Sequence, residues 1–200
     1  MPLRYPAVAG HFYEGTPEGL RRQVEECFLH RLGPGKIPTV NREGKREIIA
    51  LVCPHAGYMY SGPTAAHSYY QLALDGAPDL FVIIGPNHTG LGSGVSVMVE
   101  GTWVTPLGEV KVNREVARRI CELCEVADID ELAHRMEHSI EVQLPFLQYL
   151  YGRFSFVPIC MMIQDLETSR ELGTAIAKAV KGKNAVVIAS SDFSHYVPES

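Results

Sequence analysis

Three short apolar runs, each followed by a turn that carries a histidine, constrain most strongly what this chain can fold into. Residues 47–53, 79–84 and 185–189 are rich in Ile, Val, Leu and Ala and are shorter than typical helices, which suits buried strands. Longer stretches with helical spacing separate them. This alternation predicts an α/β fold with a mostly parallel or mixed central sheet flanked by helices.

Capping residues and apolar spacing place the other elements. Thr16 precedes Pro17 as a helix N-cap, and Asn113 is a second N-cap. Pro145 is expected to kink the helix in which it lies. Helices are predicted at residues 16–30, 63–74, 113–124, 137–150 and 166–180, and further strands at residues 95–99 and 155–160.

The composition narrows the class of protein. A hydrophobic fraction of 46% and a charged fraction of 20% are enough for one buried core, so we expect a single domain over residues 1–200. The net charge of −5 disfavours nucleic-acid binding. No apolar run approaches the ~20 residues that cross a bilayer. The N-terminus lacks a secretory signal and the five cysteines are irregularly spaced, which predicts a soluble cytoplasmic protein.

The end of the chain carries a further expectation. The strand at residues 185–189 is followed by few residues before Ser200, and no closing helix is visible there. A parallel strand inside a sheet normally has a crossover element that covers it. We therefore expect these residues to be the N-terminal part of a longer chain.

The turns after the three apolar runs carry the candidate functional residues. His55 follows the first run, His88 the second, and Asp192 and His195 the third. Ligands of open α/β sheets bind beyond the carboxyl ends of the strands, so these side chains converge if the strands are parallel neighbours. A lone histidine is more often structural, but three at matching strand ends favour a site. Imidazole binds zinc, iron and copper and titrates near neutrality, which suits both metal binding and proton transfer.

Two other histidines leave alternatives open. His138 and Glu141 lie three residues apart on a predicted helix, where they can be two ligands or a pair behind the ligands. An exposed, salt-bridging face with Glu137 and Arg135 explains the pair equally well. His11 can line a pocket rim, although docking of the N-terminal segment by its aromatic residues is the simpler interpretation.

Four ordered motifs carry a resemblance to a known family. They are C-P-H-A-G-Y at residues 53–58, G-P-N-H at 85–88, E-H-S-I-E at 137–141 and S-D-F-S-H at 191–195. Together they resemble the Memo family, which includes the bacterial and archaeal AmmeMemoRadiSam system protein B, over nearly the whole chain. That family is similar in fold to class III extradiol dioxygenases of the LigB type, so the resemblance implies a LigB-like α/β fold.

The resemblance also implies roles for site residues. His55 and His88 match the family's two metal-binding histidines, and Asp192 and His195 match further site residues. The family's third ligand is a cysteine later in the chain, and no cysteine follows His195 here. Either the chain is cut short or its metal site is incomplete.

These observations lead to a main hypothesis and two rivals. The first is a metal-dependent oxidoreductase in which His55 and His88 hold iron(II) or copper, with zinc as a further option, while His195 exchanges protons beside Asp192. The alternative is a non-catalytic module that captures an anionic or phosphorylated peptide in the same pocket. A third hypothesis is metal-assisted hydrolysis. Either a small molecule or a peptide fits as the ligand.

Overall fold

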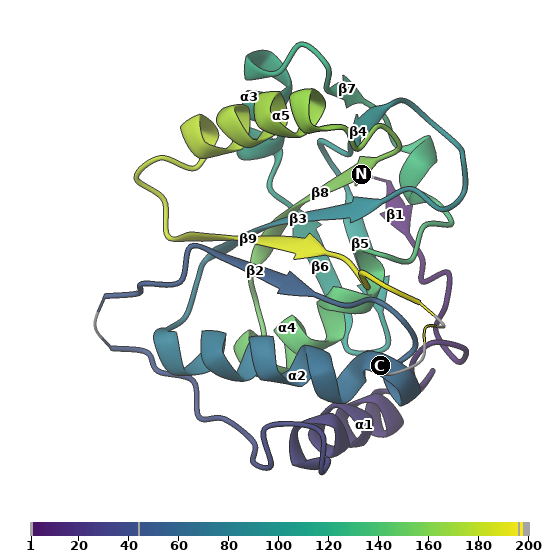
Figure 1. Cartoon of the computed structure of the whole chain (residues 1–200), viewed down its shortest axis with the longest axis vertical. Helices are drawn as coiled ribbons and strands as arrows, with labels where there is room; N and C mark the ends of the chain where they lie inside the picture. Colours follow the sequence, from purple (N-terminus) through teal and green to yellow (C-terminus); the bar gives the residue numbers. More distant parts are fainter. Residues whose placement is uncertain (1, 44, 196, 198–200) are drawn as a thin grey trace.

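A computed structural model describes residues 2–43, 45–195 and 197. It confirms the predicted α/β architecture, a mostly parallel sheet between two layers of helices (Figure 1). The expected continuation beyond residue 200 lies outside the described residues. One face of the sheet is covered by α1 (Pro17–Leu29), α2 (Tyr58–Asp75) and α4 (Leu144–Tyr151), and the other by α3 (Arg114–Leu123) and α5 (Leu166–Ala179).

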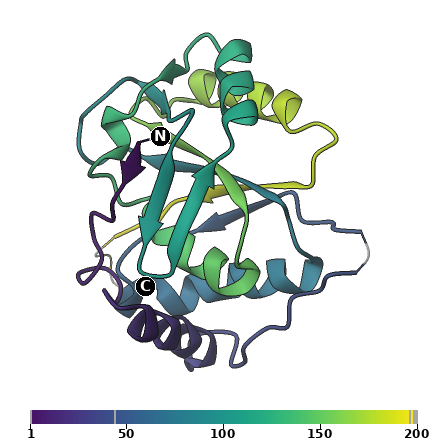
Figure 2. The same cartoon turned by 180° about the vertical axis from the view of Figure 1, so that it is seen from behind.

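Nine strands form the sheet within the described residues. The main path runs β1-β5-β6-β8-β3-β9-β2. Two strands lie off this path: β4 pairs with β8, and β7 pairs with β4. The strands are β1 (Leu3–Arg4), β2 (Ala50–Cys53), β3 (Leu80–Pro86), β4 (Val95–Val97), β5 (Thr102–Thr105), β6 (Gly108–Val112), β7 (Asp128–Ile129), β8 (Ser155–Met161) and β9 (Ala185–Ser190). The segment from β6 through β8, β3 and β9 to β2 is parallel throughout, whereas β5 and β6 form an antiparallel hairpin, seen in front in Figure 2.

The register of the parallel strands fixes where the site forms. Ile84 of β3 pairs with Ala189 of β9, and Cys53 of β2 pairs with Ser190 of the same strand. The three strands therefore end at nearly the same level. The turns that follow them leave at one edge of the sheet, as the sequence predicts.

Aromatic rings fill much of the core. Between α1, α2 and α4, the Tyr69 and Phe146 rings stack at 4.8 Å and the Phe28 ring meets Phe146 edge-on at 5.6 Å. Toward the β5–β6 hairpin, Trp103 of β5 packs edge-on against Phe156 of β8 at 5.4 Å. All five side chains are buried, which gives the strands a rigid base.

The two predicted caps are confirmed. Thr16 Oγ1 accepts a hydrogen bond from Gly19 N at 3.2 Å, and Asn113 Oδ1 accepts one from Val116 N at 3.1 Å. Each cap satisfies a backbone donor that the first helical turn leaves without a partner.

The predicted helix over residues 137–150 is wrong in its first half. Residues 137–140 are irregular, a 3-10 helix (η2, Glu141–Gln143) follows, and α4 begins only at Leu144. Pro145 thus lies in the first turn of α4, where its missing N–H leaves no bond unmade, instead of kinking a longer helix. As a result, His138 and Glu141 do not share a helix face.

Two further predictions need correction, and one hairpin was not predicted. The strand predicted at residues 47–53 starts at Ala50 and is not buried, because β2 pairs only with β9 among the described strands and Val52 is 48% exposed. α2 begins at Tyr58, five residues before the predicted start at residue 63. The β5–β6 hairpin was missed.

No described helix is both long and apolar enough to cross a membrane.

Candidate metal centre

Three histidine rings meet at the carboxyl edge of the sheet. His55 follows β2, His88 follows β3, and His138 lies in the irregular segment before η2. The ring centroids are 5.3 Å apart for His55 and His88, 5.7 Å for His55 and His138, and 4.6 Å for His88 and His138. Each ring offers one possible ligand atom, and these three atoms all lie within 4.8 Å of one another. Among the described residues, these three histidines form the group that could hold a metal ion. Metal–nitrogen bonds of about 2.0–2.1 Å would require these atoms to lie closer together, which rotation of the rings could provide.

The tautomer of His55 follows from the bonds that Ser190 makes. Ser190 Oγ donates its only proton to Ser139 O at 2.6 Å and accepts from Gln143 Nε2 at 2.8 Å. The 2.8 Å contact between Ser190 Oγ and His55 Nδ1 therefore has the imidazole as donor. This leaves the Nε2 lone pair of His55 available for a metal.

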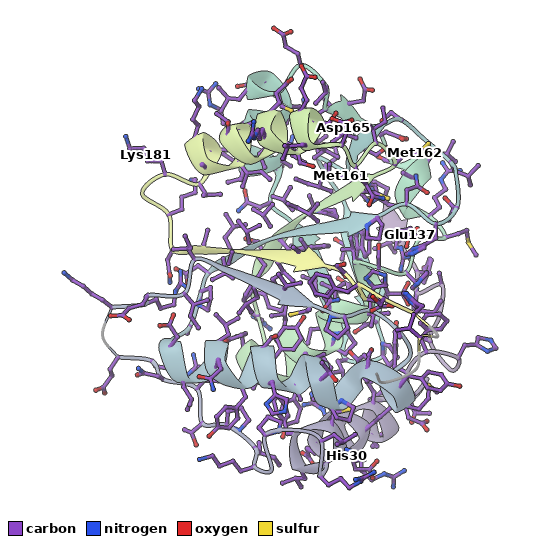
Figure 3. The ribbon with its side chains drawn as sticks, in the orientation of Figure 1. His30, Glu137, Met161, Met162, Asp165 and Lys181 are labelled. Atoms are coloured by element: carbon purple, nitrogen blue, oxygen red, sulfur yellow. The ribbon has the colours of Figure 1, made fainter. Side chains whose placement is uncertain are left out.

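A fully buried carboxylate holds the other two histidines. Glu137 Oε1 accepts from His88 Nδ1 at 2.9 Å, which leaves Nε2 of His88 available as a ligand, and it lies 3.5 Å from His138 Nδ1. The same carboxylate accepts from the backbone N–H groups of His88 (2.5 Å), His138 (2.8 Å) and Ser139 (2.8 Å). Glu137 therefore ties the turn after β3 to the segment that carries His138. Figure 3 places it at the edge toward which β2, β3 and β9 point, opposite Lys181.

The pKa values favour neutral imidazoles beside an ionised carboxylate. Burial lowers the pKa of His55 to about 4 despite the nearby Asp192 carboxylate, and burial also lowers the pKa of His138. For Glu137, burial opposes ionisation, but hydrogen bonds from His88 and Ser139 outweigh it and lower the pKa to about 2. Neutral imidazole is the form that binds metals, and a carboxylate behind it strengthens the nitrogen as a ligand. The residues present thus fit a divalent metal.

Asp192 and His195 lie beside the three rings. Asp192 Oδ1 accepts from the backbone N–H groups of His55 and, at 3.1 Å, Ala56. Asp192 Oδ2 lies 3.0 Å from His195 Nε2 and 3.8 Å from His55 Nε2. Burial opposes ionisation of Asp192, but the backbone and histidine contacts outweigh it and hold its pKa below the usual value. The carboxylate is thus nearly buried, whereas the His195 side chain is about half exposed.

A cavity of about 410 Å³ opens over the histidines. It adjoins a second cavity of about 440 Å³, and the two share the residues Ala56, Tyr60, Asp192 and His195. Cavities of this size take small molecules or a short peptide segment. The histidine cavity is lined by His11, Phe12, His55, Ala56, Gly57, Met59, Tyr60, His88, His138, Asp192 and His195. No Lys or Arg occurs among these lining residues, and Asp192 brings a carboxylate.

The sequence left His138 open between a ligand and a salt-bridging residue and did not single it out as the third member of the cluster. Its spacing to Glu141 misdirected the interpretation, because Glu141 points to a different, buried partner. The E-H pair at residues 137 and 138 was the usable signal, since a carboxylate beside a ligand histidine is a common supporting arrangement. Among the described residues, no cysteine belongs to the cluster, and burial raises the pKa of Cys53, the thiol nearest to His55 in sequence, to about 11.

Comparison with known proteins gives a consistent picture. A family model described as Memo-like protein matches residues 4–200. A MEMO1 family protein of Methanopyrus kandleri is 54% identical over 198 residues, which cover 98% of this chain and 70% of the relative. A MEMO1 family protein of Sulfolobus acidocaldarius is 54% identical over 201 residues, covering 98% and 71%. One of Methanothermobacter thermautotrophicus is 52% identical over 199 residues, with the same coverage.

Proposed function

This chain belongs to the Memo-like protein family, and from that premise we propose that it is a metal-dependent oxidoreductase that holds iron(II) or copper on His55, His88 and His138. The observation that carries the proposal is the convergence of three imidazoles whose possible ligand atoms lie within 4.8 Å of one another. Two of the rings donate their Nδ1 protons elsewhere, His55 to Ser190 and His88 to Glu137, which leaves Nε2 of each ring for a metal. Three nitrogen ligands leave coordination positions for a substrate or O2. When bound, such a metal supplies Lewis-acid and one-electron redox chemistry.

The protein's own groups supply positioning and proton transfer. Asp192 accepts a hydrogen bond from Nε2 of His195, which fixes the ring's tautomer at the edge of the shared cavity. We assign His195 the role of general acid or base and Asp192 the role of its orienting carboxylate. The exposed side chains of Met59 and Tyr60 at the cavity rim give a substrate apolar surface to contact.

The cavity lining favours this proposal over capture of a phosphorylated peptide. Phosphate sites are built from Arg, Lys or backbone N–H groups, and the lining residues include no Arg or Lys. The Asp192 carboxylate also repels an anion. A neutral or metal-chelating small molecule suits the cavity better.

Metal content tests the assignment of ligands. Protein purified without oxygen is analysed for bound metal, with iron or copper expected at one ion per chain. His55→Ala, His88→Ala and His138→Ala should each lose most of it. His67→Ala is the matched control, because His67 lies on α2 and its ring contacts Leu32 O at 3.0 Å, away from the cluster. A His138→Ala variant with full metal content would remove His138 from the ligand set.

Turnover separates the three functions. Oxygen uptake with a catechol as probe is expected from metal-loaded protein, and His195→Gln should keep its metal while lowering the rate about 10²- to 10⁴-fold. Stoichiometric binding of a phosphopeptide without oxygen uptake would support the binding module instead. Oxygen-independent cleavage of an ester probe would support hydrolysis.

A further inference from the structure

A segment far from the histidines in sequence encloses one side of the candidate centre. Residues 4–13, here called the N-terminal strap, begin at a buried arginine. Arg4 Nε donates to His134 O at 3.0 Å, one Nη donates to Glu137 O at 2.5 Å, and the other pairs with the Glu141 carboxylate. The guanidinium also lies 4.3 Å from the centroid of the Trp103 ring. Arg4 thus binds the carbonyls at the two ends of the segment 134–137, which leads directly into His138.

Glu141 anchors the strap at its middle and its far end. Its side chain is completely buried, and its oxygens accept from Ala7 N (2.8 Å), Val8 N (3.2 Å) and Tyr13 Oη (2.5 Å) besides the Arg4 guanidinium. A carboxylate with this many donors holds them in one arrangement. The strap therefore cannot shift without breaking several buried hydrogen bonds.

Phe12 connects the strap to two of the three histidines. Its ring lies 4.7 Å from the His138 ring, and its carbonyl accepts from Tyr58 N at 2.7 Å, three residues after His55. His138 lies in an irregular segment outside the sheet and the helices, where its carbonyl accepts from Val142 N at 3.0 Å. Its ring is placed by contacts with Glu137 on one side and with Phe12 of the strap on the other.

We infer that Arg4 and Glu141 are positioning residues of the metal centre, because they clamp the strap and loop that hold His138 against His55 and His88. This inference rests on the proposed metal site. A buried ion pair can serve stability alone, so the distinguishing consequence is on the metal itself. Loosening the clamp should weaken binding and change the coordination geometry.

The chain offers a matched control in a second ion pair at the opposite edge of the sheet. Arg46 lies 3.8 Å from the Asp75 carboxylate and donates to Ile48 O (2.7 Å) and Ala185 O (3.0 Å), and both side chains of the pair are 13% exposed. The two oxygens of Asp75 each accept one backbone N–H bond, so Asp75→Asn removes one acceptor oxygen and the charge, much as Glu141→Gln does. It should lower stability without touching the histidines.

Cobalt(II) is the probe, since its visible absorption reports coordination geometry and its affinity can be measured by chelator competition. Glu141→Gln and Arg4→Met should bind cobalt(II) about 10- to 100-fold more weakly than the unaltered chain and shift the visible bands. Asp75→Asn should keep both within twofold of normal, while its unfolding temperature falls. Phe12→Leu leaves the ion pair intact and should also weaken binding, so the test stands if a clamp variant fails to fold.

The outcomes separate the two proposals. If the unaltered chain binds neither cobalt(II) nor another divalent metal, the proposed function falls and the clamp with it. If cobalt(II) binds but Glu141→Gln, Arg4→Met and Phe12→Leu keep the affinity and spectrum of Asp75→Asn, the clamp is only structural and this inference is wrong.

Discussion

Replacing Glu137 with glutamine tests how much the candidate centre depends on its buried carboxylate. In the structure, Glu137 accepts hydrogen bonds from His88 Nδ1 and from the backbone N–H groups of His88, His138 and Ser139. The side chain is fully buried, so no water replaces a lost bond. Glutamine has nearly the same shape but only one acceptor oxygen. The substitution therefore removes an acceptor and the charge while keeping the volume.

The magnitude follows from the geometry. If the glutamine oxygen takes the place of Oε1, its NH2 group faces the backbone N–H of His88, and two donors confront each other. Loss of a hydrogen bond to a charged acceptor costs about 1.5–3 kcal/mol of stability. The turn that carries His88 should also move, and both imidazoles lose a carboxylate partner. Such losses behind metal ligands reduce affinity about 10- to 100-fold, or roughly 1.4–2.8 kcal/mol.

The assay is competition for cobalt(II) or zinc(II) with a chromophoric chelator near neutral pH, alongside denaturant unfolding of the metal-free protein. Glu171→Gln is the control, because Glu171 on α5 also accepts two backbone N–H bonds, from Glu125 (2.8 Å) and Val126 (3.2 Å). Its substitution should leave metal affinity unchanged. Equal affinities for Glu137→Gln and the unaltered chain would show that the carboxylate does not support the metal ligands.

Three further predictions concern stability. Burial lowers the pKa of His134 to about 4, so at this residue the unfolded chain binds more protons than the folded chain between that pH and about 6.5. The contribution of His134 to stability should be constant above this window and fall by up to about 3 kcal/mol as the pH drops through it. Urea unfolding across this range should show a shallower pH slope for His134→Gln, and an unchanged slope would refute the assignment. Gly85→Ala should cost about 1–3 kcal/mol and weaken metal binding, since a Cβ there would meet Ser139 Oγ at 2.4 Å. Gly173→Ala, with nothing within 4 Å, should instead stabilise α5 by about 0.5–1 kcal/mol.

The edge at which the site forms could be predicted because it depends on local signals. Three apolar runs and the residues after them are visible in the sequence, and parallel strands align their carboxyl ends by topology. Pairing of β9 with both β2 and β3 then brings His55 and His88 together. The same local logic identified the Thr16 and Asn113 caps, whose partners lie three residues away.

The features that sequence reasoning missed depend on distant partners. Helical spacing over residues 137–150 was real, but Pro145 is compatible with both a kink and a first turn, and only packing decides between them. Arg4 and Glu141 are 137 residues apart, and nothing in either neighbourhood indicates the pairing. The sequence left His138 open between a ligand and a salt-bridging residue, and only the contacts of Arg4 and Glu137 with its segment place it at the strand ends.

Charge balance links the candidate metal ligands to the carboxylates behind them. Imidazole ligands carry no charge, so a divalent ion held by three of them would be an uncompensated cation, and its partial removal from water is costly. Glu137 and Asp192, both with pKa values held below normal, place two negative charges within hydrogen-bonding or ion-pair distance of the rings. The two carboxylates would therefore offset the +2 charge of such an ion. On the proposed function, the three imidazoles would hold the ion and leave positions open for a ligand, which is what oxidative chemistry at such a metal requires.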